Sequence, residues 1–122
     1  MSTQDKIYEI LCDILDIEKK DIKPESYLIR DLNAESIDLL ELAVSINQAF
    51  NIKVNEDEIF LRQLRYYLET ESGNPPKKIL QEKYFFLSSD RISQILIDLE
   101  QGPVLKVKDL IHYVTSQLTS PT

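Results

Sequence analysis

Apolar residues recur at intervals of three and four along most of this chain, which is the spacing of a single helix face. The stretches that show this spacing are 3–16, 36–50, about 55–70, about 90–101 and about 107–118. Strict alternation of apolar and polar residues, which would indicate half-buried strands, is not sustained in any of them. The pattern therefore predicts an all-α fold built from short amphipathic helices.

The segments between these helices differ in how clearly they can be interpreted. Residues 17–35 contain Pro24 and follow neither period, so we expect a long loop whose few apolar residues pack on the core. Residues 71–78, ESGNPPKK, interrupt the helical pattern because glycine and proline do not extend a helix. The stretch 79–87, ILQEKYFFL, is compatible with a short helix or with extended chain. Serines 88 and 89 offer caps for the following helix, and Gly102 ends it.

The second helix, 36–50, is more apolar than the others. One face is formed by Leu39, Leu42, Ala43, Ile46, Ala49 and Phe50, and it is widened by Ile37, Leu40 and Val44. Only a narrow polar stripe remains, consisting of Asp38, Glu41, Ser45 and Gln48. We therefore expect a helix with a broad buried side.

Length and composition exclude several classes of function. A chain of 122 residues corresponds to one domain, 1–122, and two glycines are too few for a dinucleotide fingerprint or a phosphate loop. One histidine, His112, and one cysteine, Cys12, are too few for zinc sites, so we predict no metal site. The net charge of −7 disfavours nucleic acid and favours partners with basic surfaces.

Targeting features are lacking from the sequence. No stretch approaches the roughly 20 apolar residues of a membrane span, and the amino terminus lacks the layout of a secretion signal. We therefore expect a cytoplasmic protein without a membrane span. Cys12 has no second cysteine to pair with, and its place in an apolar pattern predicts a small buried hydrophobe.

Ser36 stands where the apolar period of the second helix begins, and three roles fit that position. A serine there commonly caps the helix by accepting a backbone N–H. It can also carry a phosphate ester, because the free amides and the dipole at a helix start favour that group. Nucleophilic catalysis is disfavoured, since Ser36 lacks the flanking glycines of a nucleophile elbow and lies 76 residues from His112. We predict no catalytic residue.

Ser36 lies within the segment DLNAESIDLLELAVSINQAFNIKV. This segment resembles the core signature of acyl carrier proteins, and the matching positions are Asp31, Leu32, Glu35, Ser36, Ile37, Asp38, Glu41, Leu42, Phe50 and Ile52. The first helix, the loop KPESYLIRDL and the closing segment VLKVKDLIHYV, with Val107 and Tyr113, also resemble that family. The resemblance implies an acyl-carrier-like helical bundle.

The same resemblance implies a function. Ser36 would carry 4′-phosphopantetheine, whose thiol holds an acyl chain as a thioester, and the apolar side of the second helix would shelter that chain. The acidic residues Glu35, Asp38 and Glu41 would dock on basic patches of a phosphopantetheinyl transferase and of acyl synthases and transferases. We expect a monomer that serves fatty acid or other lipid biosynthesis, lipid A and lipopolysaccharide included, or polyketide biosynthesis.

Two other functions remain open at this stage. An aminoacyl or peptidyl carrier would also be modified on Ser36, but such carriers usually have glycines where this chain has Asn33, Ala34 and Glu35. A carrier-derived interaction module would bind partners through its acidic helix without being modified.

The chain departs from the family pattern in two places. Asn47 and Gln48 stand where many members continue the acidic stripe. Ser36 and Tyr113 are 77 residues apart, farther than in the family by an inserted segment of about 42 residues, approximately 60–101, which we expect to be helical. The remaining carrier frame, 1–59 and 102–119, would then hold the whole negative charge, because the 60–101 segment has six basic and six acidic residues. That segment adds a helical layer, or it reshapes the acyl cavity or a partner surface.

Overall fold

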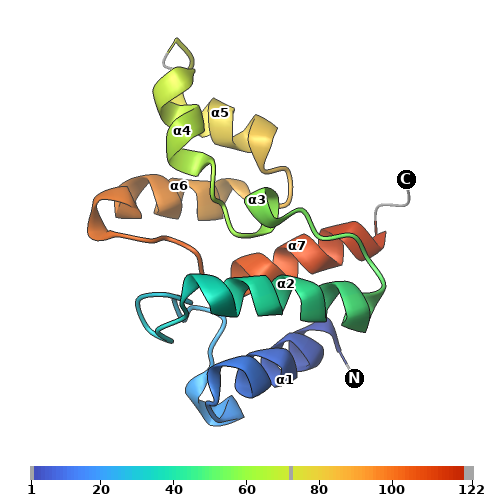
Figure 1. The fold of residues 1–122 in the computed structure, drawn as a ribbon. Helices are drawn as coiled ribbons and strands as arrows, with labels where there is room; N and C mark the ends of the chain where they lie inside the picture. The colour runs from blue at the N-terminus through green and yellow to red at the C-terminus, as the bar shows by residue number, and fades with distance from the viewer. Residues whose placement is uncertain (1, 72, 120–122) are drawn as a thin grey trace.

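The computed structural model describes residues 2–71 and 73–119, and within them every regular element is helical (Figure 1). The α-helices are α1 (Thr3–Leu15), α2 (Ser36–Phe50), α3 (Glu56–Ile59), α4 (Leu64–Thr70), α5 (Pro76–Lys83), α6 (Ser89–Asp98) and α7 (Val107–Thr119). Two short 3-10 helices are added, η1 (Lys19–Asp21) and η2 (Leu99–Gln101). The predicted all-α fold is confirmed.

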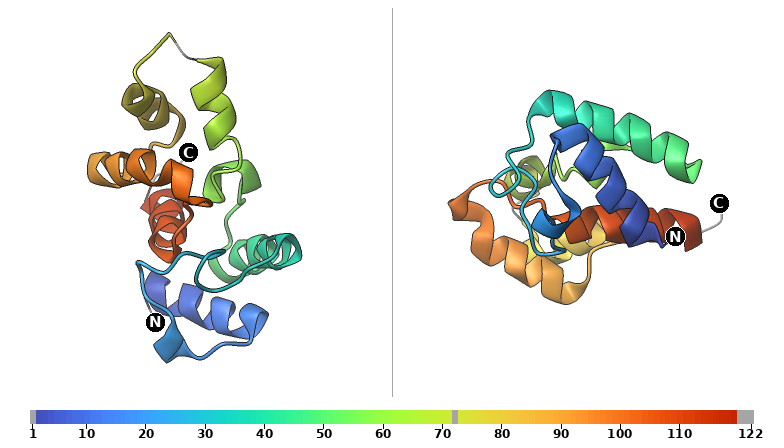
Figure 2. Two further views of the ribbon diagram at one scale, coloured as in Figure 1. Left: turned by 90° about the vertical axis from the view of Figure 1, so that its left-hand side faces the viewer. Right: turned by 90° about the horizontal axis from the view of Figure 1, so that it is seen from below.

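The helices are stacked along the length of the molecule. Helix α1 lies at one end and packs against both α2 and α7, as the bundle expected from the sequence requires. Helix α6 follows as the next layer, and α4 and α5 pair at the opposite end (Figure 2). Helices α1, α2, α3 and α7 of the frame are thus extended by the helices of the 60–101 segment, with one hydrophobic core running through both regions.

The long loop before α2 is packed onto the frame, as predicted. Its apolar residues Ile22 and Leu28 are buried. The loop also runs beside the segment that enters α7, because the Leu28 amide donates to the Leu105 carbonyl at 3.1 Å and the Val107 amide donates to the Ser26 carbonyl at 2.9 Å. These backbone bonds connect the approach to α2 with the segment that leads into α7.

Helix α2 buries a narrower face than the pattern predicts. Leu39, Leu42, Ala43 and Ile46 are buried, in agreement with the predicted core face. The prediction was wrong for Ala49, which is exposed, and for Ile37, Leu40 and Val44, whose exposed fractions are 62%, 52% and 48%. The reason is that the helices packed on α2 cover only one side of it, so its remaining apolar residues meet solvent.

The predicted helix over 55–70 is two helices. It breaks after Ile59, and Leu61 takes the left-handed conformation with φ 55°. Ile59, Phe60 and Leu61 are all buried, whereas three consecutive residues of a regular helix point in directions that span about 200°. The break allows all three to face the core, and burial offsets the roughly 1–2 kcal/mol that a left-handed non-glycine residue costs.

The ambiguous stretch 79–87 is helical up to Lys83 and forms a turn after it. Helix α5 begins at Pro76, which is tolerated in a first turn, and it ends at Lys83, after which the chain turns. The predicted serine cap is confirmed, since Ser88 Oγ accepts the Arg91 amide at 3.1 Å at the start of α6.

Aromatic rings connect the 60–101 segment to the frame. Ring centroids are 6.1 Å apart between Tyr67 and Tyr84, 6.1 Å between Tyr84 and Phe86, and 5.1 Å between Phe86 and Tyr113 on α7. The series runs from α4 to α7. The Tyr84 hydroxyl is buried and has no hydrogen-bond partner within the described part of the chain. Contact between rings, and not polar pairing, therefore holds Tyr84 in place.

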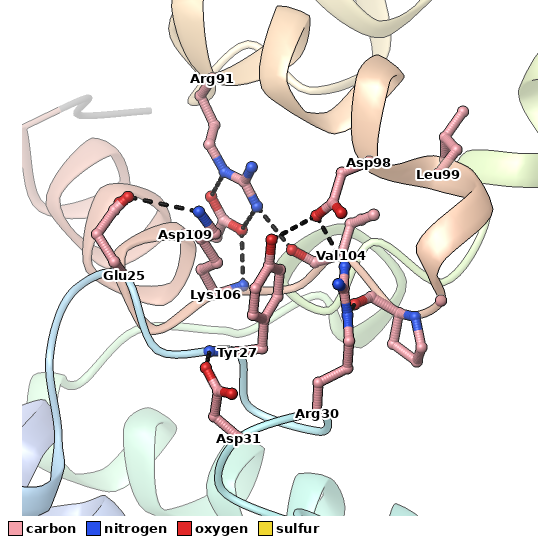
Figure 3. Close-up of polar contacts among 12 residues, drawn as sticks. Glu25, Tyr27, Arg30, Asp31, Arg91, Asp98, Leu99, Val104, Lys106 and Asp109 are labelled. Atoms are coloured by element: carbon pink, nitrogen blue, oxygen red, sulfur yellow. Dashed lines mark hydrogen bonds and ion pairs between the residues drawn. The ribbon is translucent and has the colours of Figure 1, made fainter.

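A buried ion pair adds a second connection between the two regions. Arg91 of α6, 2% exposed, donates to both carboxylate oxygens of Asp109 of α7, 0% exposed, at 2.8 Å each (Figure 3). Arg91 also donates to the Val104 carbonyl at 2.7 Å, and Asp109 accepts the Lys106 amide at 2.9 Å. Each charge is therefore matched by several hydrogen bonds, as burial of an ion pair requires.

Candidate functional site

Ser36 is the first residue of α2 and its side chain is exposed. The preceding residue, Glu35, occupies the capping position with extended backbone angles of φ −105° and ψ 170°. The interpretation of Ser36 as the helix cap is therefore wrong. Its hydroxyl makes no hydrogen bond with another described residue, so it is accessible to a modifying enzyme.

The loop that leads to Ser36 is held by its own backbone. Asn33 adopts the left-handed conformation, φ 59°, and its amide donates to the Ile29 carbonyl at 3.2 Å. The next amide, that of Ala34, donates to the Leu28 carbonyl at 3.0 Å, and Ala34 is buried. Asparagine tolerates this conformation better than most residues, so the turn forms without a glycine at that position.

The start of α2 has free hydrogen-bond donors beside the hydroxyl. The Glu35 amide donates a hydrogen bond to Asp38 Oδ2 at 2.8 Å. The amides of Ser36 and Ile37 lie in the first turn, where a helix has no internal acceptors, and no described residue accepts from them. A phosphate ester on Ser36 would meet these amides and the positive end of the helix dipole, so the site fits the phosphate of a phosphopantetheine group.

The three predicted docking carboxylates lie within two turns of Ser36 but differ in their surroundings. Glu35 and Glu41 are exposed, whereas Asp38 is half-buried and holds the Glu35 amide. Glu41 is thus available to a partner, and Asp38 also stabilises the helix start. Sequence analysis missed that exposed apolar side chains accompany this stripe, because Ile37, Leu40 and Val44 had been assigned to the core.

The histidine and the cysteine considered in the sequence analysis lie on helices other than α2. His112 is exposed on α7, and Cys12 on α1 is half-buried, with burial raising the pKa of its thiol. Asn47, where the acidic stripe stops, accepts the Val54 amide through its side-chain oxygen at 2.7 Å and so closes the turn after α2.

Groups of three or more metal-ligating side chains are absent from residues 2–71 and 73–119. In those residues no helix is both long and apolar enough to cross a membrane.

A polar cluster lies behind the loop that carries Ser36. Tyr27 Oη donates to Asp98 Oδ2 at 2.6 Å, and Arg30 Nη2 donates to the same oxygen at 2.7 Å (Figure 3). The hydrogen bond from Tyr27, followed by that from Arg30, holds the pKa of Asp98 below its usual range. The same contact with Asp98 raises the pKa of Tyr27. The cluster joins the loop to α6, and no sequence pattern indicated it, because its members are about 70 residues apart.

Comparisons with known proteins bear on the first half of the chain. The profile of the family described as phosphopantetheine attachment site matches residues 5–64. An acyl carrier protein of Nitratidesulfovibrio vulgaris (strain Miyazaki F) is 36% identical over 58 residues, which cover 48% of this chain and 76% of that protein. An acyl carrier protein of Chlamydia trachomatis serovar L2 is 38% identical over 58 residues, covering 48% and 75% respectively. No solved structure matches the chain significantly.

The matched region covers α1 from Asp5 onward, the packed loop, α2 and α3, and therefore the loop and the helix that carry Ser36. Helices α5, α6 and α7 lie beyond it. Acyl carrier proteins hold acyl groups on phosphopantetheine and do not convert them. Phosphopantetheine is therefore the prosthetic group, and the chain acts as a carrier and not as a catalyst. The chain belongs to the acyl carrier protein family.

Proposed function

We propose that Ser36 is the residue that carries 4′-phosphopantetheine and that the chain holds an acyl group on it as a thioester. The observation that supports this most directly is the exposed Ser36 hydroxyl at the first position of α2, next to amides that have no acceptor among residues 2–71 and 73–119. The thiol of the bound group supplies the thioester chemistry. The chain's own residues position the phosphate through the Ser36 and Ile37 amides and keep the serine accessible.

The face of α2 around Ser36 is proposed to dock partner enzymes. It combines the exposed carboxylates of Glu35 and Glu41, with Asp38 beside them, and an apolar strip of Ile37, Leu40 and Val44. Acidic groups steer encounter with a basic surface, while exposed apolar side chains gain from burial in the complex. The expected partners are a phosphopantetheinyl transferase and the acyl synthases and transferases of fatty acid or other lipid biosynthesis.

The test of the attachment site is a measurement of intact mass. The protein is incubated with coenzyme A and a permissive phosphopantetheinyl transferase, as wild type, as Ser36→Ala, and as Ser45→Ala. Ser45 lies on the same helix and is half-buried, so its replacement is a matched control. We expect one phosphopantetheine group on the wild type and on Ser45→Ala, and none on Ser36→Ala. A wild type that gains no group would refute the carrier function, and a modified Ser36→Ala would place the group elsewhere.

A further inference from the structure

The last residue of α6, Asp98, connects the 60–101 segment to the loop that leads to Ser36 (Figure 3). One carboxylate oxygen, Oδ2, accepts hydrogen bonds from Tyr27 Oη at 2.6 Å and from Arg30 Nη2 at 2.7 Å. The side chains of Arg30 and Asp98 are only 24% and 16% exposed, so salt screens this ion pair less than a pair at the surface. A carboxylate at the end of a helix lies at the negative end of the helix dipole, which disfavours it locally. The contacts with the loop offset that cost.

Arg30 fixes the loop at a second point. Its Nε donates to the Pro103 carbonyl at 2.7 Å, and its guanidinium lies over the Tyr27 ring, 3.7 Å from the centroid. Tyr27, Arg30 and Asp98 therefore form one contact in which each side chain touches the other two. Removal of the carboxylate would leave the hydroxyl and the guanidinium without their shared acceptor.

The turn that ends at Ala34, two residues before Ser36, is closed by hydrogen bonds within itself. The Tyr27 carbonyl accepts the Asp31 amide at 3.0 Å, and the Leu28 carbonyl accepts the Ala34 amide at 3.0 Å. The Asp31 carboxylate in turn accepts the Tyr27 amide at 2.9 Å. Because its two ends are bonded to each other, this turn moves as one body. A contact at Tyr27 therefore sets the direction in which the chain enters α2.

The end of α6 is itself held in place. Arg65 of α4 donates through Nη2 to the Leu99 carbonyl at 2.7 Å and to the Gly102 carbonyl at 3.0 Å, directly after Asp98. Earlier on α6, the buried ion pair of Arg91 holds the helix to α7. Asp98 is thus a fixed point against which the turn before Ser36 is aligned.

Apolar packing holds the same turn without fixing its orientation. Leu28 and Ala34 are buried, and the Leu28 amide donates to the Leu105 carbonyl at 3.1 Å. Burial of apolar side chains is not directional, and the bond to Leu105 does not by itself prevent rotation, whereas the paired bonds to Asp98 require defined angles. Loss of Asp98 should therefore leave the turn packed but free to tilt.

We infer, as an extension of the proposed function, that Asp98 is a positioning residue for phosphopantetheine transfer. By holding Tyr27 and Arg30, it keeps the turn in the orientation that presents the Ser36 hydroxyl to the transferase. Asp98 acts through the loop and not through contact with the transferred group. A displacement of about 1 Å at a reacting atom lowers a rate by about 100-fold. The 60–101 segment thereby controls the modification of the frame.

The test measures kcat and KM for transfer from coenzyme A by a permissive phosphopantetheinyl transferase, with this chain as the varied substrate. In Asp98→Ala we expect kcat to fall about 10-fold or more while KM changes by less than about two-fold. The reason is that the docking face on α2 is unchanged and the loss falls on the transition state. Asp98→Asn keeps an oxygen that can accept from Tyr27 and Arg30, so it should recover most of kcat.

Two further variants separate positioning from loss of stability and loss of charge. Tyr113→Phe removes a hydrogen bond with the Asn55 amide in the frame, so it is destabilised without a change at the turn. Glu100→Ala removes an exposed carboxylate two residues after Asp98. Both should keep the kcat of the wild type. An equal fall of kcat in Tyr113→Phe and Asp98→Ala would overturn the inference.

A second measurement uses the unmodified protein and needs no transferase. Amide hydrogen exchange, followed by NMR, compares the wild type with Asp98→Ala and with Tyr27→Phe, which keeps the ring and removes the hydroxyl. We expect the amides of Asn33 and Ala34 to exchange about 10-fold faster in both variants, while the amides of α1 exchange as in the wild type. Unchanged exchange at the turn, or equal acceleration in α1, would overturn the inference.

The two hypotheses fail in different ways. A wild type that gains no phosphopantetheine refutes the proposed function and the inference with it. A wild type that is modified, with a kcat that does not depend on Asp98, refutes the inference alone.

Discussion

The frame and the 60–101 segment use charge in opposite ways. On α2 of the frame the carboxylates of Glu35 and Glu41 lie in solvent, next to apolar side chains that are also exposed. The 60–101 segment turns a charge inward, since Arg91 is buried against Asp109, and it leaves Phe85 and Ile97 exposed by 60% and 83%. A charge in solvent is free to meet a partner and costs little to change, whereas a buried charge holds the structure and is costly to change.

The comparison also explains how the two regions remain one body. Rings from Tyr67 to Tyr113 and the pair of Arg91 with Asp109 join them by contacts that water does not reach. The ion pair of Arg91, the hydrogen bonds to Asp98 and the buried hydroxyl of Tyr84 can therefore be tested against the charge of Glu41, which lies in solvent. The expected effects on stability decrease in that order.

The largest effect is expected from Arg91→Ala. Removing the guanidinium leaves the buried Asp109 carboxylate unpaired, which lowers the free energy of unfolding by about 3–5 kcal/mol. Urea denaturation followed by circular dichroism measures the change. Arg62→Ala is the matched control, because Arg62 is exposed and 3.6 Å from Glu56, and it should change stability by less than about 1 kcal/mol. Equal losses in both variants would mean that the buried pair is not a special connection.

A smaller effect is expected from Asp98→Asn, which weakens the hydrogen bonds from Tyr27 and Arg30 and lowers stability by about 1–2 kcal/mol at neutral pH. Because the native pKa of Asp98 is lowered, its contribution is present above the ordinary pKa of about 3.9 and is lost as pH falls through the native pKa. Urea denaturation midpoints, determined at a series of pH values from neutral to below about 4, measure this contribution of Asp98 to stability.

The acid-induced loss of stability should therefore be shallower in Asp98→Asn than in the wild type. Glu100→Gln serves as control, since Glu100 is exposed on η2, two residues after Asp98. The control should keep the wild-type profile. Parallel profiles for the wild type and Asp98→Asn would contradict the assignment of the acid-sensitive contact to Asp98.

Removing the Tyr84 hydroxyl should leave stability unchanged or raise it by up to about 1 kcal/mol, because that hydroxyl is buried and no described residue bonds to it. Tyr113→Phe is the matched variant, since its hydroxyl accepts the Asn55 amide at 3.1 Å, and it should lose about 1 kcal/mol. Both are measured by urea denaturation. A loss in Tyr84→Phe as large as that in Tyr113→Phe would reveal a hydrogen bond to the Tyr84 hydroxyl.

The smallest effect on stability, within about 0.5 kcal/mol, is expected from Glu41→Lys, because Glu41 is exposed. Its effect on docking should be larger: the initial rate of phosphopantetheine transfer falls several-fold, and the dependence of that rate on salt weakens. Glu9→Lys makes the same change of net charge on an exposed position of α1. An equal slowing in both variants would mean that net charge, and not the α2 face, controls the encounter.

The local features of the fold were largely predictable. The starts of α2 and α6 and the helical character of 60–101 follow from periodicity and from serine signals within a few residues. The interruption predicted for 71–78 was wrong for 76–78, because Pro76 opens α5, and proline is tolerated in a first turn. Within the site, the position of Ser36 at a helix start and the exposure of Glu41 were also predictable, because both depend on neighbours along one helix.

Features that depend on distant residues were not predictable. The break at Leu61 and the exposure of Ile37, Leu40 and Val44 depend on which helices cover which side, and a repeating pattern does not contain that information. The burial of Arg91 depends on Asp109, a partner 18 residues away on another helix. As a charged residue on an amphipathic helix, Arg91 is typical of a solvent-exposed position.

By itself the sequence determined that this is a helical carrier with an acidic helix start at Ser36, because helix period, capping chemistry and the family signature are all local. Only the tertiary structure decided how the 60–101 segment is attached, which apolar residues of α2 meet solvent, and which residue of that segment meets the loop before Ser36. These properties arise from packing between helices, whose free energy depends on shapes and charges brought together from distant parts of the chain.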